Sequence, residues 1–448
     1  MKPLRAPSPA CFRRTKVHVC PAGRDQSAVA IIDQLAPRDR DLRRRARKVI
    51  PNGMYGHMAA QVLPEGYPQF IERADGARMW DVDGREYLDL MSSWGPIVLG
   101  HRYPAVEEAV RTQAGAGDCF DGTSPRMVEL AEAFVDLVPY ADWAMFAKNG
   151  TDATTLCCTI ARAHTGREIV VIARGAYHGA APWCTPYPAG VTAADRQNLV
   201  YFEYNDIDSL HAAIAGIEDR VAAVIACPVR HDVRREQELA EPQFARALRE
   251  TCDRIGALLV LDEVRTGFRL DVRGSWESFG VRPDLSAWSK AIANGYALSA
   301  VLGRTDLRDA AGRVYTTGSF WFSAVSMAAS LATLGVVNTA AFESNLRAAG
   351  EQLRTGLLAQ AEAYGFQVRY TGPVQMPLLT FVADEDFALG NAWASAAISN
   401  GVYVHPHHNW FLNAAHTPAV IEEILQRTDA AYATLAGQPV AGRGLLTG

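Results

Sequence analysis

The stretch LLVLDEVRTGFR, residues 258–269, carries the residue from which the fold and the site are best derived. Its first four residues are apolar and end in Asp262, a pattern typical of a buried strand in a parallel sheet. A second apolar run, residues 285–289, ends at Lys290. Because ligand sites in such sheets lie at the carboxyl ends of the strands, we expect Asp262 and Lys290 to face one cavity.

An acid and an amine at one sheet edge suit the cofactor pyridoxal phosphate. A buried carboxylate beside the pyridine nitrogen keeps that nitrogen protonated, so the ring can accept the electron pair released at the substrate's amine-bearing carbon. A lysine whose amine is partly deprotonated can attack the cofactor's aldehyde and later carry a proton. Either residue alone is more often a helix cap or a solvated charge, so the interpretation needs support from the rest of the chain.

The composition is that of an ordinary globular protein. With 448 residues, of which 49% are hydrophobic and 21% charged, the chain has enough material for two packed domains. The net charge of -5 gives no basic field for nucleic acid, and no apolar run approaches the roughly 20 residues of a membrane span. Eight cysteines without the paired spacing of a disulfide scaffold or a zinc site indicate reduced thiols and a cytoplasmic protein.

Strand and helix patterns divide the chain into segments. Residues 70–90 contain two hairpin signals, Asp75-Gly76 and Asp83-Gly84, and predict a small antiparallel meander. Apolar strands alternate with amphipathic helices from residue 126 to residue 302, which is typical of a mainly parallel α/β sheet. We expect strands at 143–147, 169–173, 221–227, 258–262, 285–289 and 298–302. The predicted segments are a mobile extension (1–45), the N-terminal part of a small domain (46–110), a large cofactor-binding domain (111–337) and a C-terminal small domain (338–448).

The start of the helix after the first of these strands is a candidate phosphate site. Gly150 and Thr151, in NGTDAT, would offer backbone N–H groups at a helix N-terminus. Asp152 would repel a phosphate unless its carboxylate points away. Thr317, Gly318 and Ser319 could also donate to a phosphate, although an ordinary capped or polar turn explains both segments without a ligand.

Aromatic residues and histidines mark other parts of the predicted cavity. Tyr177 and His178 follow a strand, where an aromatic ring could stack on a flat cofactor. Trp94 lies in a segment broken by Gly and Pro, so we expect it on a loop that lines a pocket or covers the core. The histidine-rich run YVHPHHN, residues 403–409, is better explained as a pocket rim than as a metal site, and no metal is expected.

Taken in order, these motifs resemble one family from about Val49 to Ala436. They are similar to the class III aminotransferases of the fold-type I pyridoxal phosphate enzymes, nearest to the glutamate-1-semialdehyde aminomutase branch. The matching stretches are WDVDGREYLDL, SSWGPIVLGHRYP, NGTDAT, ARAHTGREIVV, GAYHG, LLVLDEVRTGFR, PDLSAWSKAIANG, TGSF and FLNAAHT.

The resemblance implies roles for particular residues. Lys290 would hold the cofactor as a Schiff base, and Asp262 would pair with the ring nitrogen. Ser319 would reach the phosphate in a neighbouring subunit, which implies a homodimer. The implied cofactor-binding residues are Gly150, Thr151, Tyr177, His178, Asp262, Val264, Lys290 and Ser319, with Val264 and Tyr177 on opposite faces of the ring.

Departures from the family pattern concern the substrate. Relatives commonly carry glutamate where Cys227 stands, and the glycine-rich run after the lysine is here Ala-Asn-Gly with Asn294 at its centre. The segment PNGMYGHMAAQ lacks the arginine with which the aminomutase holds its substrate's carboxylate, which argues against glutamate semialdehyde. The candidate substrate residues are His57, Trp94, Arg230 and Arg265; His231, like the two arginines, is unusual at its position.

Three functions remain open at the level of sequence. The first is an aminotransferase that moves an amino group from an amino donor to a keto or aldehyde acceptor. The second is an aminomutase or a racemase/epimerase that uses the same lysine. The third is a non-catalytic relative, which the retention of both Asp262 and Lys290 disfavours.

Overall fold

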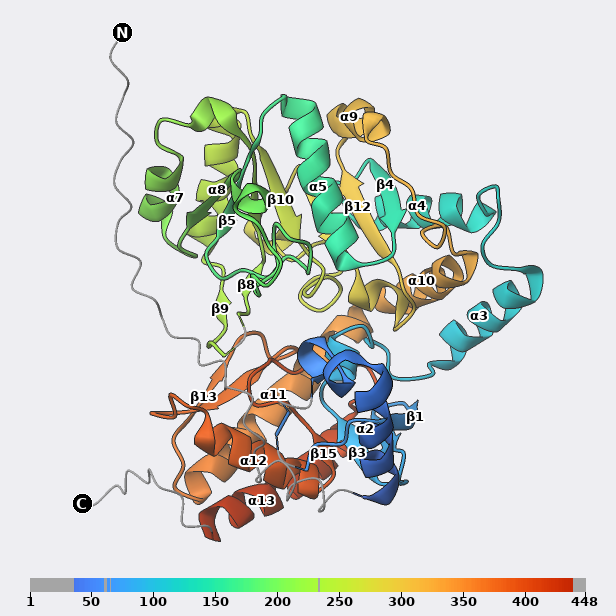
Figure 1. Ribbon diagram of the computed structural model, residues 1–448, viewed down its shortest axis with the longest axis vertical. Coiled ribbons are helices and arrows are strands. Elements are labelled where there is room, and N and C mark those ends of the chain that lie inside the picture. Colours follow the sequence, from blue (N-terminus) through green and yellow to red (C-terminus); the bar gives the residue numbers. More distant parts are fainter. Residues whose placement is uncertain (1–35, 60–62, 65, 233, 438–448) are drawn as a thin grey trace.

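The structure is a computed structural model that describes residues 36–59, 63–64, 66–232 and 234–437. Figure 1 shows two lobes: a large domain built around a central sheet, and a small domain that combines the two ends of the described chain. Residues 1–35 of the expected extension (1–45) lie outside the described residues. The rest of that segment is helical from Pro37 on, because helix α2 (Pro37–Val49) begins there.

Seven strands form the central sheet in the order β4-β12-β11-β10-β7-β5-β6. β12 runs antiparallel to both of its neighbours, and the other adjacent pairs are parallel. The sheet is therefore mainly parallel, which confirms the predicted fold class. Its strands are β4 (Trp143–Ala147), β5 (Ile169–Ala173), β6 (Leu199–Phe202), β7 (Val221–Ala226), β10 (Leu258–Asp262), β11 (Leu285–Trp288) and β12 (Ser299–Gly303).

Successive residues of the central strands pack on opposite faces of the sheet. On one face, Ile225 and Val260 share a core cluster with residues of α5, and on the other, Val224 and Leu259 share one with residues of α8. Both faces are covered, which explains why these strands are apolar throughout. The helices from α3 to α10 are α3 (Pro104–Ala116), α4 (Pro125–Leu137), α5 (Gly150–Thr165), α6 (Ala193–Arg196), α7 (Ile207–Ile214), α8 (Pro242–Ile255), α9 (Arg308–Arg313) and α10 (Ala324–Val337).

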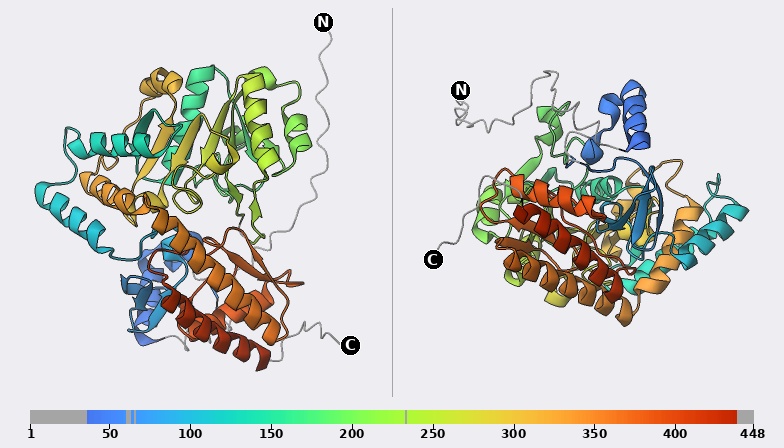
Figure 2. Two further views of the ribbon diagram at one scale, coloured as in Figure 1. Left: turned by 180° about the vertical axis from the view of Figure 1, so that it is seen from behind. Right: turned by 90° about the horizontal axis from the view of Figure 1, so that it is seen from below.

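The small domain joins residues that are far apart in the sequence. The predicted meander forms β1 (Ile71–Asp75), β2 (Arg78–Asp81) and β3 (Glu86–Asp89), and β15 (Val402–Tyr403) pairs parallel with β3. Helices α11 (Ala340–Ala363) and α13 (Pro418–Gly437) pack side by side, as Figure 2 shows. The remaining elements are α12 (Ala388–Ser399), the hairpin β13 (Val368–Thr371) and β14 (Leu378–Phe381), and the short pair β8 (Val229–Arg230) and β9 (Glu238–Leu239).

Helix α2 is fixed to the small domain by hydrogen bonds at its first turns. The buried carboxylate of Asp39 accepts the backbone N–H of Gln69 at 3.0 Å. Arg43 pairs with Asp39 and donates to the carbonyl oxygen of Tyr67 at 2.6 Å. The basic residues after Arg43 are mostly exposed.

None of the helices within the described ranges is by itself long and apolar enough to cross a bilayer. Helices α10 and α11 meet the criteria of length and composition only as a pair, and that pair is bent by 79°.

Candidate active site

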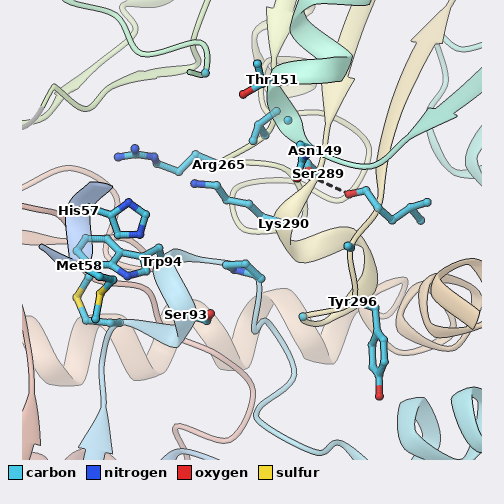
Figure 3. Close-up of a pocket in the computed structure, with 18 of the residues that line it drawn as sticks. His57, Met58, Ser93, Trp94, Asn149, Thr151, Arg265, Ser289, Lys290 and Tyr296 are labelled. Atoms are coloured by element: carbon cyan, nitrogen blue, oxygen red, sulfur yellow. Dashed lines mark hydrogen bonds between the residues drawn. The ribbon is translucent and has the colours of Figure 1, made fainter. Parts of the chain in front are cut away.

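A cavity of about 700 Å³ opens at the carboxyl edge of the central sheet. Asp262 at the end of β10 and Lys290 just after β11 both line it, as the sequence predicts. The start of α5 forms a second side, and the meander and the loop that carries Trp94 form a third. Figure 3 shows the side chains of Lys290 and Arg265 extending next to one another into this space.

Lys290 is held in a tight turn directly after its strand. Its φ of 51° lies in the left-handed region, which is costly for a residue with a side chain and is found most often at functional sites. Burial, together with the nearby guanidinium groups of Arg265 and Arg269, lowers the pKa of the amine from its ordinary value of 10.5 to about 7. A large fraction of the amine is therefore neutral, and nucleophilic, near pH 7.

Asp262 is buried and oriented by two hydrogen bonds. One oxygen, Oδ2, lies 2.8 Å from His178 Nδ1, and Oδ1 accepts the backbone N–H of Val264 at 3.0 Å. Both residues that touch the carboxylate lie close to it along the edge of the cavity. His178 therefore orients the acid, and it lines the cavity beside Asp262.

The N-terminus of α5 has the close backbone approach that a phosphate needs. A Cβ atom at Gly150 would lie 2.6 Å from Val264 Cγ1, and one at Gly179 would lie 2.5 Å from Thr151 Oγ1, so neither glycine can be replaced without movement. The carboxylate of Asp152 accepts the backbone N–H of Asn149 at 2.8 Å. Asp152 itself does not line the cavity, so its charge is directed at this backbone N–H and not into the space available to a phosphate.

These residues fit pyridoxal phosphate. A neutral lysine, an oriented buried acid and a helix N-terminus with a glycine cradle occupy three sides of one cavity, which suit the aldehyde, the ring nitrogen and the phosphate of the cofactor. When bound, the cofactor supplies an electron sink for the substrate's amine-bearing carbon. The protein holds the acid, positions the amine and lines the remaining space.

An aromatic and apolar wall faces Lys290 across the cavity. The rings of His57 and Trp94 lie with centroids 4.3 Å apart, and Met58, Met79 and Met91 line the same region. Trp94 follows two further residues with positive φ, and its own φ is 64°. Trp94 lines the cavity and also packs against the hydrophobic core, so the structure shows both roles that the sequence left open. Its segment forms a 3-10 turn, residues 92–94, rather than an open loop.

Asn294 fixes the wall to the turn that carries Lys290. Its Oδ1 accepts the backbone N–H groups of Val98 and Leu99 at 2.9 and 2.8 Å, and its Nδ2 donates to the carbonyl oxygen of Gly100 at 3.0 Å. Asn294, which stands where relatives have a glycine-rich run, thus ties the loop after Trp94 to the turn that carries Lys290.

The two candidate arginines differ in their surroundings. Arg265 lines the cavity, as expected for a substrate residue. Arg230 does not line it, because its Nε pairs with Asp232 Oδ2 at 3.0 Å and its Nη2 donates to the carbonyl oxygen of Arg174. The prediction that Arg230 contacts substrate is corrected: it is a buried, neutralised residue behind the cavity.

Other predicted residues are placed as follows. Tyr177 and Val264 line the cavity, and 38% of Tyr177 is exposed, so part of its ring is accessible. Ser319 lies on an exposed turn and does not line this chain's own cavity. Its role toward a neighbouring subunit stays a prediction.

Several lining residues were not singled out from the sequence. Met79 and Met91 come from the meander and the residues just after it, where an apolar residue looks like part of an ordinary core. His101, whose Nε2 lies 2.8 Å from Asp89 Oδ2, is a second example. Only their place in space distinguishes these residues, so no sequence pattern could have found them.

Three potential metal ligands meet at the wall of the cavity. The ligand atoms of His178, Cys227 and Asp262 lie within 4.8 Å of one another. The 2.8 Å hydrogen bond between His178 and Asp262 accounts for their approach, and burial raises the pKa of the Cys227 thiol well above its ordinary value. A neutral thiol is a poor metal ligand, so the cluster is explained as support for the acid.

The fold and the site together define a fold-type I pyridoxal phosphate enzyme. The family model described as aminotransferase class-III matches residues 62–426. The aminopentol aminotransferase of Sphingopyxis macrogoltabida is 50% identical over 398 residues, covering 89% of this chain and 94% of that protein. A glutamate-1-semialdehyde 2,1-aminomutase of Acetivibrio thermocellus is 32% identical over 418 residues, covering 87% and 96% respectively.

A solved structure supports the same assignment. The pyridoxal phosphate internal aldimine form of the FumI protein of Sphingopyxis sp. MTA144 superposes with a TM-score of 0.87 at 50% identity, over 89% of this chain and 96% of that one. The chain belongs to the class III aminotransferase family. It is a pyridoxal phosphate-dependent aminotransferase, which confirms the predicted family, cofactor and reaction class.

Proposed function

We propose that the protein transfers the amino group of a primary amine to a keto or aldehyde acceptor, with Lys290 as the residue that attaches the cofactor and moves the proton. The observation that carries this proposal is the meeting of Asp262 and Lys290 in one cavity, with the pKa of the lysine lowered to about 7. An amine with this pKa is suited to take a proton from one carbon and return it to another near neutral pH.

The wall opposite Lys290 supports a bulky or extended amine as the donor. Its methionines and Trp94 give apolar area, and neutral imidazoles beside them can donate to and accept from hydroxyl groups. Burial lowers the pKa of His57, which keeps its ring neutral. The 50% identical relative is an aminopentol aminotransferase, and a hydroxylated amine of that kind suits such a wall.

A homodimer in the cytoplasm completes the proposal. Three large exposed residues, Phe120, Tyr315 and Phe320, lie on two segments that Asp118 and Ser323 join by a 2.7 Å hydrogen bond. Phe320 lies 5.3 Å from the ammonium of Lys148, which lines the cavity, so this patch is close to the site. A second copy that covered the patch would bring its own Ser319 turn toward the phosphate end. Light scattering should give twice the mass of one chain.

The test is a panel of amines added to the purified protein loaded with pyridoxal phosphate. Conversion of the cofactor to pyridoxamine phosphate together with a released aldehyde or ketone supports transfer. Inversion or rearrangement of a single substrate without a released carbonyl product would instead support the racemase or aminomutase activity. A matched Lys290→Ala protein controls for non-enzymatic exchange and should show neither result.

A further inference from the structure

Arg269 is a fully buried cation that has no acidic partner. Its exposed fraction is 0%, and within the described ranges no carboxylate lies in ion-pair contact with it. Burial lowers its pKa to about 9, so the guanidinium stays charged at neutral pH, and that charge contributes to the lowered pKa of Lys290. A buried charge without a counter-ion is costly, and the contacts of the guanidinium show what it contributes instead.

The guanidinium joins two parts of the wall that carries Trp94. Its Nη2 donates to the carbonyl oxygen of Ile97 at 3.3 Å, and its Cζ lies 5.1 Å from the centroid of the Phe411 ring. Its Nε and Nη1 are buried without a hydrogen-bond partner among the described residues. Arg269 is not one of the residues that line the cavity, so it does not contact a ligand there.

The turn that leads to Ile97 is strained. Ser92, Ser93 and Trp94 have φ values of 48°, 56° and 64°. A left-handed residue with a side chain costs about 1–3 kcal/mol and persists only where its surroundings hold it. The backbone N–H groups of Gly95 and Ile97 close the turn by donating to the carbonyl oxygen of Ser92 at 3.0 and 3.2 Å. Arg269 therefore holds the residue at which this turn ends.

Phe411 supports the same turn from the small domain. A Cβ atom at Gly95 would lie 2.9 Å from Phe411 Cε1, so the ring packs directly on the turn. The hydroxyl of Ser92 donates to the carbonyl oxygen of Phe411 at 2.8 Å. The Phe411 ring thus contacts both the strained turn and the guanidinium of Arg269.

The backbone of Arg269 is a firm base for these contacts. Its N–H donates to the carbonyl oxygen of Thr266 at 2.9 Å, and the hydroxyl of Thr266 donates to the buried Glu263 at 2.7 Å. The preceding residue, Phe268, is buried with its ring centroid 5.4 Å from that of Trp288. The large domain therefore presents the guanidinium of Arg269 to a loop of the small domain from a packed segment.

We infer that Arg269 is a positioning residue that holds Trp94 in place and thereby decides whether the cavity accepts a large apolar amine. This inference rests on the proposed transamination and names a determinant of its donor. Asn294 fixes the loop at Val98 and Leu99, and Arg269 fixes the part that precedes them. Without Arg269 the turn relaxes and the wall against which a long donor packs is lost, whereas a small amine needs only the cofactor and Lys290.

The kinetic experiment compares two amines that differ only in the length of an apolar chain: 2-aminopropane and 2-aminooctane. Wild type, Arg269→Met and Arg269→Lys are loaded with pyridoxal phosphate, and each half-reaction is followed by the absorbance of the cofactor. In Arg269→Met, we expect the apparent second-order rate constant for 2-aminooctane to fall about 10- to 100-fold through a higher half-saturation concentration, the range of one hydrogen bond to a charged group. The value for 2-aminopropane should change less than about 3-fold, and Arg269→Lys should recover part of the loss with 2-aminooctane.

Hydrogen exchange supplies a readout that does not depend on turnover. In the holoenzyme of Arg269→Met, the backbone N–H groups of residues 94–99 should exchange about 10-fold faster than in wild type, because the turn opens more often, while strand β5 should not change. The matched control is Arg167→Met. Arg167 also donates to backbone carbonyl oxygens, but at the opposite edge of the sheet. Its substitution should leave the exchange of residues 94–99 and the ratio of the two amines unchanged.

The outcomes separate this inference from the proposal beneath it. If neither amine converts the wild-type cofactor, the transfer fails for these donors, and the exchange data alone decide on Arg269. If Arg269→Met loses reactivity toward both amines by the same factor, or if residues 94–99 exchange at the wild-type rate, the inference is overturned. Arg269 then acts only through its charge on Lys290 or through the fold as a whole.

A second variant keeps the test decisive if the first does not fold. Replacing an unpaired buried charge by methionine should leave the protein folded. Should it not, Arg269→Lys keeps the charge but lacks the flat group that lies over the Phe411 ring. Residues 94–99 should then exchange about 3-fold faster than in wild type, and an unchanged rate would overturn the inference.

Discussion

The amine of Lys290 should capture pyridoxal phosphate at a pH far below that at which free lysine reacts. Burial and the two neighbouring arginines lower its pKa from 10.5 to about 7. At pH 7 about half of the apoenzyme then carries the neutral amine, against about one molecule in three thousand for an unperturbed lysine. The rate of covalent capture should rise through about pH 7 and level off above it.

The assay mixes apoenzyme with pyridoxal phosphate at pH values from 5.5 to 9, traps the product with borohydride and measures the modified Lys290 peptide by mass spectrometry. The same reaction with N-acetyl-lysine amide corrects for the titration of the cofactor itself. The Arg265→Met protein should show a higher midpoint because one of the cations that lowers the pKa is removed. Equal midpoints would show that Arg265 does not contribute to the shift, which would leave burial and Arg269 as its causes.

The same shift has a consequence for the stability of the apoenzyme. Between about pH 7 and 10.5 the folded protein binds fewer protons at Lys290 than the unfolded chain does, so the free energy of unfolding should rise with pH in that window. Lys290→Met should flatten this dependence in urea denaturation. A capture midpoint near 10.5, or a pH dependence that Lys290→Met leaves intact, would refute the reasoning.

Three further predictions concern the cofactor cradle, the acid and the excluded arginine. Gly150→Ala places a Cβ 2.6 Å from Val264 Cγ1, so thermal unfolding of the apoenzyme should show a loss of about 1–3 kcal/mol and cofactor affinity should fall; adding Val264→Ala should restore most of the lost stability, because it removes the clash. Asp262→Asn should lower kcat about 100-fold or more, because the amide cannot hold the ring nitrogen's proton, and a smaller loss would contradict the assigned role. Arg230→Met leaves Asp232 buried and unpaired, so it should destabilise the fold by about 3–5 kcal/mol while the folded fraction keeps its kcat/KM.

The central sheet was predictable because its strands have strong, uniform signals. The strands at Trp143–Ala147, Ile169–Ala173 and Leu258–Asp262 have the predicted bounds, since each is an apolar run that a polar residue or a glycine ends nearby. The edge strand Leu199–Phe202 was missed. It is covered less completely than the inner strands, and its four residues do not stand out from their surroundings.

The candidate site was predictable only as far as its residues carry local motifs. Asp262 and Lys290 follow apolar strands, and that position alone suggests a common cavity. Arg230 and Arg265 look alike in the sequence, and only the structure shows that Arg230 pairs with Asp232 whereas Arg265 lines the cavity. The left-handed conformation of Trp94, with a φ of 64°, is likewise visible only in the structure.

The parallel pairing of β3 with β15 has a consequence for synthesis of the chain. Leu88 cannot meet Val402 until almost the entire polypeptide has left the ribosome. Until then one edge of the meander stays open, and unpaired edges invite association with other chains. A nascent or prematurely terminated product would therefore contain Asp262 and Lys290 but lack the partner strand that completes the wall, and it should depend on chaperones to remain dispersed.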